Sequence, residues 1–400
     1  MAASRRRKIL AVDFGTSTCS AGIHEPAGPK LVVDQGEAAI PSVVFFPGTG
    51  DAKVGRGAQQ MLATQPTNTV RSIKRIVGRT WGDREVVGHS RALHYPLREG
   101  PGARVVLGLS SGEVTCEQVV SNIFRVLREH AERRFACRVE QVVATVPADA
   151  SAGYEAALRR AAALAHLKII ETLPEPVAGA LPLRLHLEPE DRKVLVCDFG
   201  GGTFDVTLID AGLRRLDVLA SDGDDYLGGD DFDEKLMEAI ASVVFSRSSF
   251  DMLRDAAVRA RLLLRCEEAK RALSSRSEVR LFVKDVYRNG GAMRSIDSIV
   301  ERAWVEPRWQ PLIDRALTVI TRLLARVGLE VEEVDQVALI GGTSLVPLFR
   351  RCLTGMFRPG VILPEVGAAT AVVEGAILRC AAYEQQQAEA ARPALVRSRG

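Results

Sequence analysis

The sequence predicts an α/β protein made of two lobes that share one plan. An apolar strand that runs into Asp-Phe-Gly and then a threonine occurs twice, over residues 9–18 and 194–203. Similar strands and helices follow each copy, so the second half of the chain repeats the order of the first. The length of 400 residues gives room for roughly two or three domains at about 150 residues each.

The first half of the chain begins with short β-branched segments between Gly and Pro breaks, over residues 8–46, which is typical of an antiparallel meander. Apolar periodicity then predicts a helix over 117–134, a strand over 139–146 and a helix over 153–167. Pro147 ends the strand because proline has no N–H group to donate to a sheet.

The second half shows strand, turn and strand over residues 193–220, followed by helices near 230–245 and 252–274. A further strand over 337–340 leads through a Gly-Gly-Thr-Ser turn into a helix over 348–356. The proline just before this helix supports its start, because proline is favourable in a first helical turn.

The composition excludes several classes of protein. A net charge of +3 is too small to indicate a nucleic-acid or membrane-surface partner, and we interpret the basic runs at 5–8 and 392–399 as solvated tails. No apolar run approaches the roughly 20 residues of a membrane helix, and Asp13 interrupts any secretory signal. The seven scattered cysteines indicate reduced thiols without a zinc site. We therefore expect a cytoplasmic protein.

The repeated motif carries the chemistry that the sequence indicates. A strand that ends in an acid and turns on glycines directs backbone N–H groups into a concavity that suits phosphates, and the acid can hold a hydrated metal ion. A single Gly-rich turn is more often a tight hairpin, but repetition behind an acid in both halves favours a phosphate site. Thr16, Ser17 and Thr18 add hydroxyl donors to the first loop, while Gly201 and Gly202 allow close approach in the second.

Seven separated segments together carry a family resemblance. They are Asp13-Phe14-Gly15-Thr16, Ser72-Ile73-Lys74-Arg75-Ile76-Val77-Gly78-Arg79, Val143-Ala144-Thr145-Val146-Pro147-Ala148, Glu175-Pro176, Asp198-Phe199-Gly200-Gly201-Gly202-Thr203-Phe204-Asp205, Cys266-Glu267-Glu268-Ala269-Lys270-Arg271-Ala272-Leu273-Ser274 and Gly341-Gly342-Thr343-Ser344. In this order they resemble the nucleotide-binding domain of the heat-shock protein 70 chaperone family, within the actin, hexokinase and chaperone superfamily of ATPases. The resemblance covers about residues 9–378.

The resemblance implies two ribonuclease-H-like lobes of the actin-like ATPase fold, each with a smaller inserted subdomain. The implied boundaries are lobe I at 1–190 with an insertion at about 43–116, lobe II at 191–383 with an insertion at about 230–307, and a return to lobe I at about 366–383. Residues 384–400 are rich in Gln, Ala and Arg with little to bury, so we expect a frayed helix or a disordered tail there.

The resemblance also implies catalytic roles. Lys74 would reach the terminal phosphate, Glu175 would position the attacking water or act as general base, and Thr203 would assist them. Taken alone, Lys74 belongs to a basic helix face and Glu175 is a turn residue between two prolines. The resemblance favours the catalytic interpretation of both.

Binding roles for ATP or ADP and Mg²⁺ follow from the same resemblance. The implied magnesium ligands, acting through water, are Asp13, Asp198 and Asp205. The implied nucleotide-binding residues are Gly15, Thr16, Ser17, Thr18, Gly200, Gly201, Gly202, Thr203, Glu267, Lys270, Arg271, Ser274, Gly341, Gly342, Thr343 and Leu345. The four between 267 and 274 share one helix face, which alone indicates a solvated salt-bridge stripe. The resemblance instead predicts contacts with adenosine.

Several positions depart from the family pattern. Leu345 stands where the family has an arginine that stacks on adenine, and Ala369-Thr370 replaces an acidic pair. An aromatic pair and an arginine that relay the nucleotide state become Asp149-Ala150 and Glu155. Nothing after Leu378 resembles the interdomain linker or a peptide-binding domain. We therefore expect no coupling of the nucleotide to peptide release in the usual chaperone way.

The sequence as a whole predicts an ATP-binding protein that slowly hydrolyses ATP to ADP and phosphate, works with a co-chaperone or nucleotide-exchange partner, and lacks a peptide-binding domain. One alternative is a non-hydrolysing, nucleotide-dependent interaction module, and another is a small-molecule kinase of the same superfamily. The presence of both Lys74 and Glu175 favours hydrolysis. The oligomeric state is not indicated.

Overall fold

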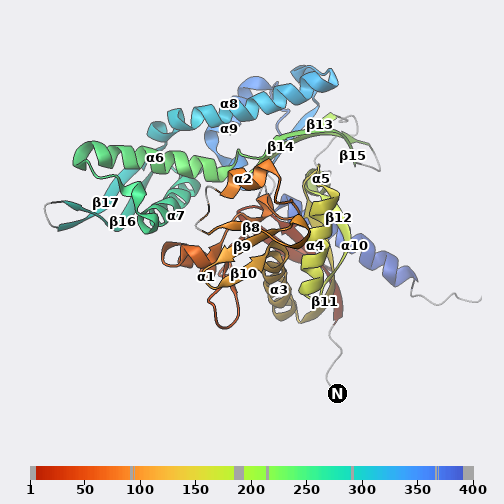
Figure 1. Cartoon of the computed structure of the whole chain (residues 1–400). Helices are drawn as coiled ribbons and strands as arrows, with labels where there is room; N and C mark the ends of the chain where they lie inside the picture. Colours follow the sequence, from red (N-terminus) through yellow and green to blue (C-terminus); the bar gives the residue numbers. More distant parts are fainter. Residues whose placement is uncertain are drawn as a thin grey trace, which may run out of the picture.

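The computed structural model describes residues 6–90, 93, 95–183, 193–212, 216–289, 292–364, 367 and 369–390. These residues form two lobes, lobe I below and lobe II above in Figure 1. The α/β class predicted from the sequence is confirmed. The expected lobe boundary at 190/191, the start of the expected return to lobe I at 366, and the last ten residues of the expected tail lie outside the described residues.

The central sheet of lobe I has the strand order β12-β11-β1-β2-β3, with β4 paired to β2. β1 pairs in parallel with β11, which pairs in parallel with β12, whereas β2 and β3 continue the sheet in the antiparallel direction. The strands are β1 (Arg6–Phe14), β2 (Thr18–Glu25), β3 (Gly28–Leu31), β4 (Ile40–Pro41), β11 (Cys137–Val146) and β12 (Lys168–Pro174).

The central sheet of lobe II repeats this arrangement in the order β15-β14-β13-β18. β13 resembles β1, because each has a parallel neighbour on one side and an antiparallel neighbour on the other. In both lobes the Asp-Phe-Gly loop joins the strand to its antiparallel neighbour. The strands are β13 (Lys193–Phe199), β14 (Phe204–Ala211), β15 (Leu216–Asp224) and β18 (Gln336–Ile340). The predicted repetition of one plan is therefore confirmed.

Helices pack beside both sheets, and α3 lies against α4 in lobe I (Figure 1). Local sequence explains several helix starts: Thr115 and Gln118 form a capping box before α3, and the Ser151 side chain caps α4. The larger helices of the lobes are α3 (Cys116–Phe135), α4 (Ala152–Leu164), α5 (Glu175–Leu183), α8 (Arg302–Val327), α9 (Pro347–Met356) and α10 (Ala371–Ala390).

Each lobe carries an inserted group of smaller elements. The insertion of lobe I holds two small antiparallel sheets and two short helices, and that of lobe II holds two helices and a long hairpin. The first comprises β5 (Val44–Phe45), β6 (Lys53–Val54), α1 (Arg56–Gln59), β7 (Thr69–Val70), α2 (Arg84–Ser90), β8 (Leu97–Glu99), β9 (Val105–Leu109) and β10 (Gly112–Thr115). The second comprises α6 (Gly229–Ser248), α7 (Ala256–Leu273), β16 (Glu278–Asn289) and β17 (Ala292–Glu301).

Helix α10 lies at the junction of the lobes, against α5 and the strands β1, β2 and β11. Its apolar face shares one buried cluster with residues of both central sheets. Residues 384–390, for which the sequence indicated a frayed helix or a disordered tail, continue this helix. Glu384 explains the extension, because its carboxylate accepts hydrogen bonds from Lys8 Nζ at 2.8 Å and from the Ile9 amide at 3.1 Å.

The contact between α10 and α5 gives a stability prediction. A Cβ atom at Gly375 would overlap the carbonyl oxygen of Ala178, so the two helices approach closely only because residue 375 is glycine. We expect Gly375→Ala to lower the free energy of unfolding by about 3 kcal/mol, the upper end of the usual cost of overpacking. Urea denaturation followed by circular dichroism would measure the change.

A matched control for this prediction is Gly355→Ala in α9. No atom lies within 4 Å of a Cβ placed there, so alanine should raise the free energy of unfolding by about 0.5–1 kcal/mol through its better helix propensity. Equal stability of the two variants would contradict close helix packing at residue 375.

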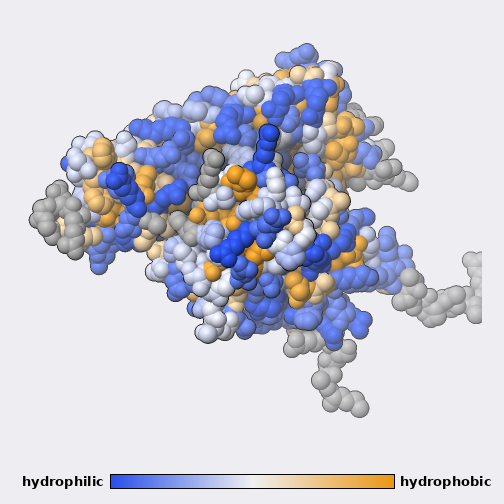
Figure 2. Space-filling view, viewed as in Figure 1, coloured by the Kyte–Doolittle hydropathy of each residue, from blue (hydrophilic) through white to orange (hydrophobic). Residues whose placement is uncertain are grey.

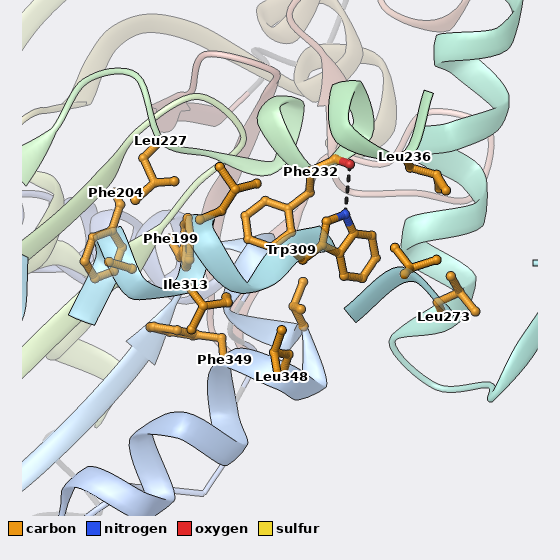
Figure 3. Close-up of a cluster of buried hydrophobic side chains, with 14 of the residues drawn as sticks. Phe199, Phe204, Leu227, Phe232, Leu236, Leu273, Trp309, Ile313, Leu348 and Phe349 are labelled. Carbon is orange, nitrogen blue, oxygen red and sulfur yellow. Dashed lines mark hydrogen bonds between the residues drawn. The ribbon is translucent and has the colours of Figure 1, made fainter. Parts of the chain in front are cut away.

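An aromatic cluster fills the core of lobe II and fixes the loop after β13 (Figure 3). Phe199 lies 4.7 Å from Phe204 and 5.0 Å from Phe349, measured between ring centroids. Phe232 packs on Trp309 at 5.4 Å, and Trp309 Nε1 donates a hydrogen bond to the Phe232 carbonyl at 3.0 Å. Each such ring pair adds about 0.5–1.5 kcal/mol beyond the burial of its surface. Phe199 is the phenylalanine of the second Asp-Phe-Gly loop, so its packing in this cluster anchors the loop.

Large exposed hydrophobic side chains are scattered over several elements, and the face in Figure 2 is largely hydrophilic over α8. The seven cysteines are free thiols, as predicted. Among the described residues, no helix combines the length and apolar character that crossing a membrane requires.

Candidate functional site

The two Asp-Phe-Gly loops meet between the lobes around a cavity of about 90 Å³. Asp13 lies near the end of β1 and Asp198 near the end of β13, and each is followed by a fully buried phenylalanine. The cavity is lined by Asp13, Gly15, Thr16, Ser17, Thr18, Lys74, Glu175, Asp198, Gly200, Gly201, Thr203, Gly341, Gly342, Ala369 and Val372. Residues far apart in the sequence, most of them candidates from its motifs, thus surround one space.

The loops contact each other directly across the junction. A Cβ atom at Gly201 would overlap the side chain of Ser17, and one at Gly202 would lie 2.6 Å from the Thr16 side chain. Ser17 Oγ donates a hydrogen bond to Asp230 Oδ1 at 3.0 Å, which ties the first loop to helix α6 of lobe II. Glycine is therefore required in the second loop for the lobes to approach this closely.

Lys74 and Glu175 form an ion pair at the floor of the cavity, with 2.6 Å between Nζ and Oε1. Lys74 lies in the short 3₁₀ turn Ile73–Arg75, and Glu175 is the first residue of α5. Both side chains are only 10% exposed. Burial disfavours the charge on Lys74, but the nearby Glu175 carboxylate outweighs it, so the pKa of Lys74 is raised and the amine stays protonated.

Three aspartates surround this ion pair and give the site an excess of negative charge. Burial, with the Glu175 charge next, raises the pKa of Asp13 to about 6 and that of Asp205 to about 7. The same two causes raise the pKa of Asp198 well above its ordinary value. Such shifts mean that burial and the neighbouring carboxylate disfavour the charged form of these side chains. Among the described residues, no three carboxylate, histidine or cysteine side chains are arranged to hold a metal ion directly.

The helix face predicted for adenosine is partly engaged within the protein. Lys270 Nζ donates to the Gly229 carbonyl and to Asp233 Oδ2, both at 2.7 Å, so it fastens α7 to the start of α6. Glu267 and Arg271 line another cavity, of about 110 Å³, which is lined by residues of both insertions and shares Thr16, Ser17 and Thr18 with the first cavity. The Ser274 hydroxyl points back to the Lys270 carbonyl at 3.5 Å.

The glycine turn after β18 completes the wall of the cavity. Gly341 has φ of 79°, a left-handed conformation that favours glycine. Thr343 Oγ1 donates to the Gly200 carbonyl at 2.7 Å and so holds this turn against the second loop. Leu345, at the end of the short 3₁₀ helix Gly342–Leu345, is half-buried.

Four supporting residues were missed by sequence reasoning. Thr145 Oγ1 donates to Asp13 Oδ1 at 3.0 Å, Ser42 Oγ donates to the Gly15 carbonyl at 2.9 Å, and Arg75 donates to the Gly202 carbonyl at 2.8 Å. The fourth is Asp230, the partner of Ser17. Thr145 and Arg75 lie inside motifs that carried the resemblance, so their positions gave a signal, whereas Ser42 and Asp230 gave none.

A comparison with known families identifies the family of this chain. The family model described as Hsp70 protein matches residues 9–391, nearly the whole chain. The matched region includes both Asp-Phe-Gly loops, the Lys74–Glu175 pair and the glycine turn after β18. The chain therefore belongs to the Hsp70 protein family and is an ATP-binding protein of this chaperone family.

Proposed function

We propose that this protein binds MgATP between its lobes and hydrolyses it slowly to ADP and phosphate. The observation that supports this most strongly is the buried ion pair of Lys74 and Glu175 beside the two glycine loops. Hydrolysis requires a cation near the terminal phosphate and a base near the attacking water, and these two side chains supply both.

In the proposed reaction, each residue has a defined task. The loop amides and the hydroxyls of Thr16 and Thr203 bind phosphate oxygens. Glu175 orients a water molecule and accepts its proton as the water oxygen attacks the terminal phosphorus. The bond from that phosphorus to the ADP oxygen breaks, and the Lys74 ammonium offsets the charge that develops on the transferred group.

The aspartates fit a magnesium ion bound through water. Asp13, Asp198 and Asp205 offer carboxylate oxygens as ligands, and a nearby cation would favour their charged forms, which burial and the Glu175 charge disfavour. Magnesium keeps several of its waters and takes few protein ligands directly, in line with the lack of a direct metal cluster among the described residues. When bound, the ion would neutralise charge on the outer phosphates.

The adenosine end of the proposed site lies between α7 and the glycine turn after β18. Glu267, Arg271 and Ser274 remain the candidates to contact ribose and adenine on one side, with Thr343 and Leu345 on the other. Lys270 would contribute its aliphatic stem, because its amine is bound to Asp233. A leucine at 345 offers adenine apolar contact in place of a stacked cation.

A non-hydrolysing interaction module is a second candidate, because the relay of the nucleotide state differs from the family pattern. Glu155, at the position of the family's arginine, accepts a hydrogen bond from Thr172 Oγ1 at 2.8 Å and lies 3.6 Å from Arg159. These contacts hold the Glu155 side chain between its own helix, α4, and the strand β12. In either case we expect a co-chaperone or nucleotide-exchange partner.

Product analysis separates the candidates: free phosphate for the ATPase, none for the module, and a phosphorylated metabolite for a kinase.

Nucleotide binding is tested by thermal unfolding. A ligand at 100 times its Kd stabilises the folded state by about 2.7 kcal/mol, so MgATP and MgADP should raise the Tm by about 3 °C or more for a protein of this size. AMP should raise it much less because the glycine loops bind the outer phosphates. Equal stabilisation by AMP would contradict the proposed phosphate site, and EDTA should reduce the shift given by ATP.

A further inference from the structure

Two carbonyl groups of the second Asp-Phe-Gly loop are held by hydrogen bonds from the lobe that carries this loop. The Gly200 carbonyl accepts hydrogen bonds from Thr343 Oγ1 at 2.7 Å and from the Gly229 amide at 3.1 Å. The Gly201 carbonyl accepts one from the Asp230 amide at 2.8 Å. Lobe II therefore fixes the orientation of two consecutive peptide groups in its own loop.

The next carbonyl of the loop is held from the other lobe, by Arg75. Its Nη2 donates to the Gly202 carbonyl at 2.8 Å and its Nη1 to the Asp225 carbonyl at 2.6 Å. The guanidinium carbon also lies 5.5 Å from the centroid of the Tyr226 ring. Arg75 directly follows Lys74 in the 3₁₀ turn of lobe I. The third peptide group of the loop is thus fixed only by a contact between the lobes.

A carbonyl held on one side directs the next N–H group to the opposite side, because a trans peptide group is planar. The described residues contain no cis peptide bond. The three held carbonyls therefore orient the N–H groups of Gly201, Gly202 and Thr203. Within the described part of the chain, none of these three N–H groups has an acceptor. They are donors of fixed direction that a ligand can use.

The last of the three N–H groups, that of Thr203, is directed toward the first cavity. Arg75 lines a larger cavity, of about 500 Å³, which shares Lys74 and Thr203 with the first one. Arg75 does not line the first cavity. The Gly202 carbonyl faces Arg75 and so the larger cavity, and the Thr203 N–H points the other way. Lys74 and Glu175 line the first cavity beside Thr203.

We infer that Arg75 is a positioning residue for the terminal phosphoryl group of ATP. It holds the peptide group between Gly202 and Thr203 so that the Thr203 N–H donates to an oxygen of that phosphoryl group, while Arg75 itself does not touch the nucleotide. The inference rests on the proposed function, since it concerns the same site. Because Arg75 belongs to lobe I and the loop to lobe II, this donor is aligned only while the lobes are closed.

Arg75→Ala tests this inference with a probe that needs no turnover. Beryllium fluoride takes the place of the terminal phosphoryl group when MgADP is bound, and calorimetric titration measures its affinity. The variant should bind beryllium fluoride about 10- to 100-fold more weakly, the range for losing one hydrogen bond to a charged group. Single-turnover hydrolysis should fall by a similar factor, while the affinity for MgADP stays within about twofold of the parent.

Two further variants make the test specific. Arg75→Lys keeps a donor but lacks the planar fork that reaches both carbonyls, so it should give a smaller loss and serves if the alanine variant does not fold. Arg315→Ala is the matched control. Arg315, on α8 of lobe II, donates to Asp224 Oδ2 at 2.7 Å and to the Tyr226 carbonyl at 3.1 Å. It holds the same segment as Arg75 without contacting the glycine loop, so its removal should leave the affinity for beryllium fluoride unchanged.

The outcomes separate this inference from the proposed function. Unchanged affinity for beryllium fluoride in both Arg75 variants would overturn the role of Arg75, whether or not the parent hydrolyses ATP. An equal loss in Arg315→Ala, or an equal loss of MgADP affinity in Arg75→Ala, would also overturn it, because the effect would then not be specific to the Gly202 carbonyl. If the parent shows no turnover but Arg75→Ala binds beryllium fluoride more weakly, the ATPase proposal fails and the role of Arg75 stands.

Discussion

Lys74→Ala and Glu175→Ala will each lower single-turnover ATP hydrolysis by about 10- to 1,000-fold, the range typical of removing one positioned catalytic group. The reason is that the cation and the base are joined in one buried pair with 2.6 Å between them. Without Lys74, the charge on the transferred group is not offset, and without Glu175 the water is neither oriented nor deprotonated. Rapid mixing with labelled ATP, followed by quench, measures the rate.

The same two variants will also have a lower free energy of unfolding. This loss of stability must be measured separately from the loss of catalysis. Removing one partner of a buried ion pair leaves the other charge uncompensated and costs about 3–5 kcal/mol. Glu175 without Lys74 would be one more carboxylate beside Asp13 and Asp198. The double variant should therefore recover part of the lost free energy of unfolding, while its hydrolysis stays at the level of the slower single variant. Recovery of the rate together with stability would show that the pair is structural.

A matched control is the exposed pair of Arg98 and Glu113, which has the same 2.6 Å separation but side chains that are 58% and 59% exposed. Its removal should change the free energy of unfolding by at most about 1 kcal/mol and leave hydrolysis unchanged. Hydrolysis at the parent rate in both Lys74→Ala and Glu175→Ala would refute their catalytic role.

The fold was largely predictable because its signals are local. An apolar strand that ends in Asp-Phe-Gly occurs twice, and each copy became the strand beside the site. Helix α10 shows the limit of such signals. Its last turns are rich in Gln and Ala, which left a frayed helix and a disordered tail as alternatives, whereas Glu384 accepts a hydrogen bond from the amide of Ile9, far away in sequence. Contacts of that kind depend on the fold and cannot be read from composition.

The site was predictable only in part, for the same reason. Lys74 and Glu175 are 101 positions apart, and taken alone they are a surface lysine and a turn acid. The family resemblance placed them at one site, and the structure gives the ion pair. Helical spacing correctly put Glu267 and Lys270 on α7. It gave no signal that Asp233, from another helix, binds the Lys270 amine.

Gly201→Ala will weaken MgATP binding by about 10- to 100-fold, because overpacking of this kind costs about 1–3 kcal/mol and each 1.4 kcal/mol is roughly tenfold in affinity. The new methyl group would overlap the side chain of Ser17 and so force the two glycine loops apart. The cost acts on binding because both loops must hold the same phosphates. Calorimetric titration with MgATP measures the affinity, and Gly57→Ala, with open space around its Cβ, should bind like the parent.

A compensating change makes this prediction specific to the contact between the loops. Ser17→Gly removes both atoms that the methyl group would overlap, so the double variant Gly201→Ala with Ser17→Gly should bind MgATP more tightly than Gly201→Ala alone. Full recovery is not expected, because Ser17 also donates to Asp230 at 3.0 Å and that link between the lobes is lost. Parent-like affinity in Gly201→Ala would mean that the loops separate without cost and do not hold the nucleotide together. Weak binding that Ser17→Gly fails to relieve would place the clash elsewhere, at the ligand itself.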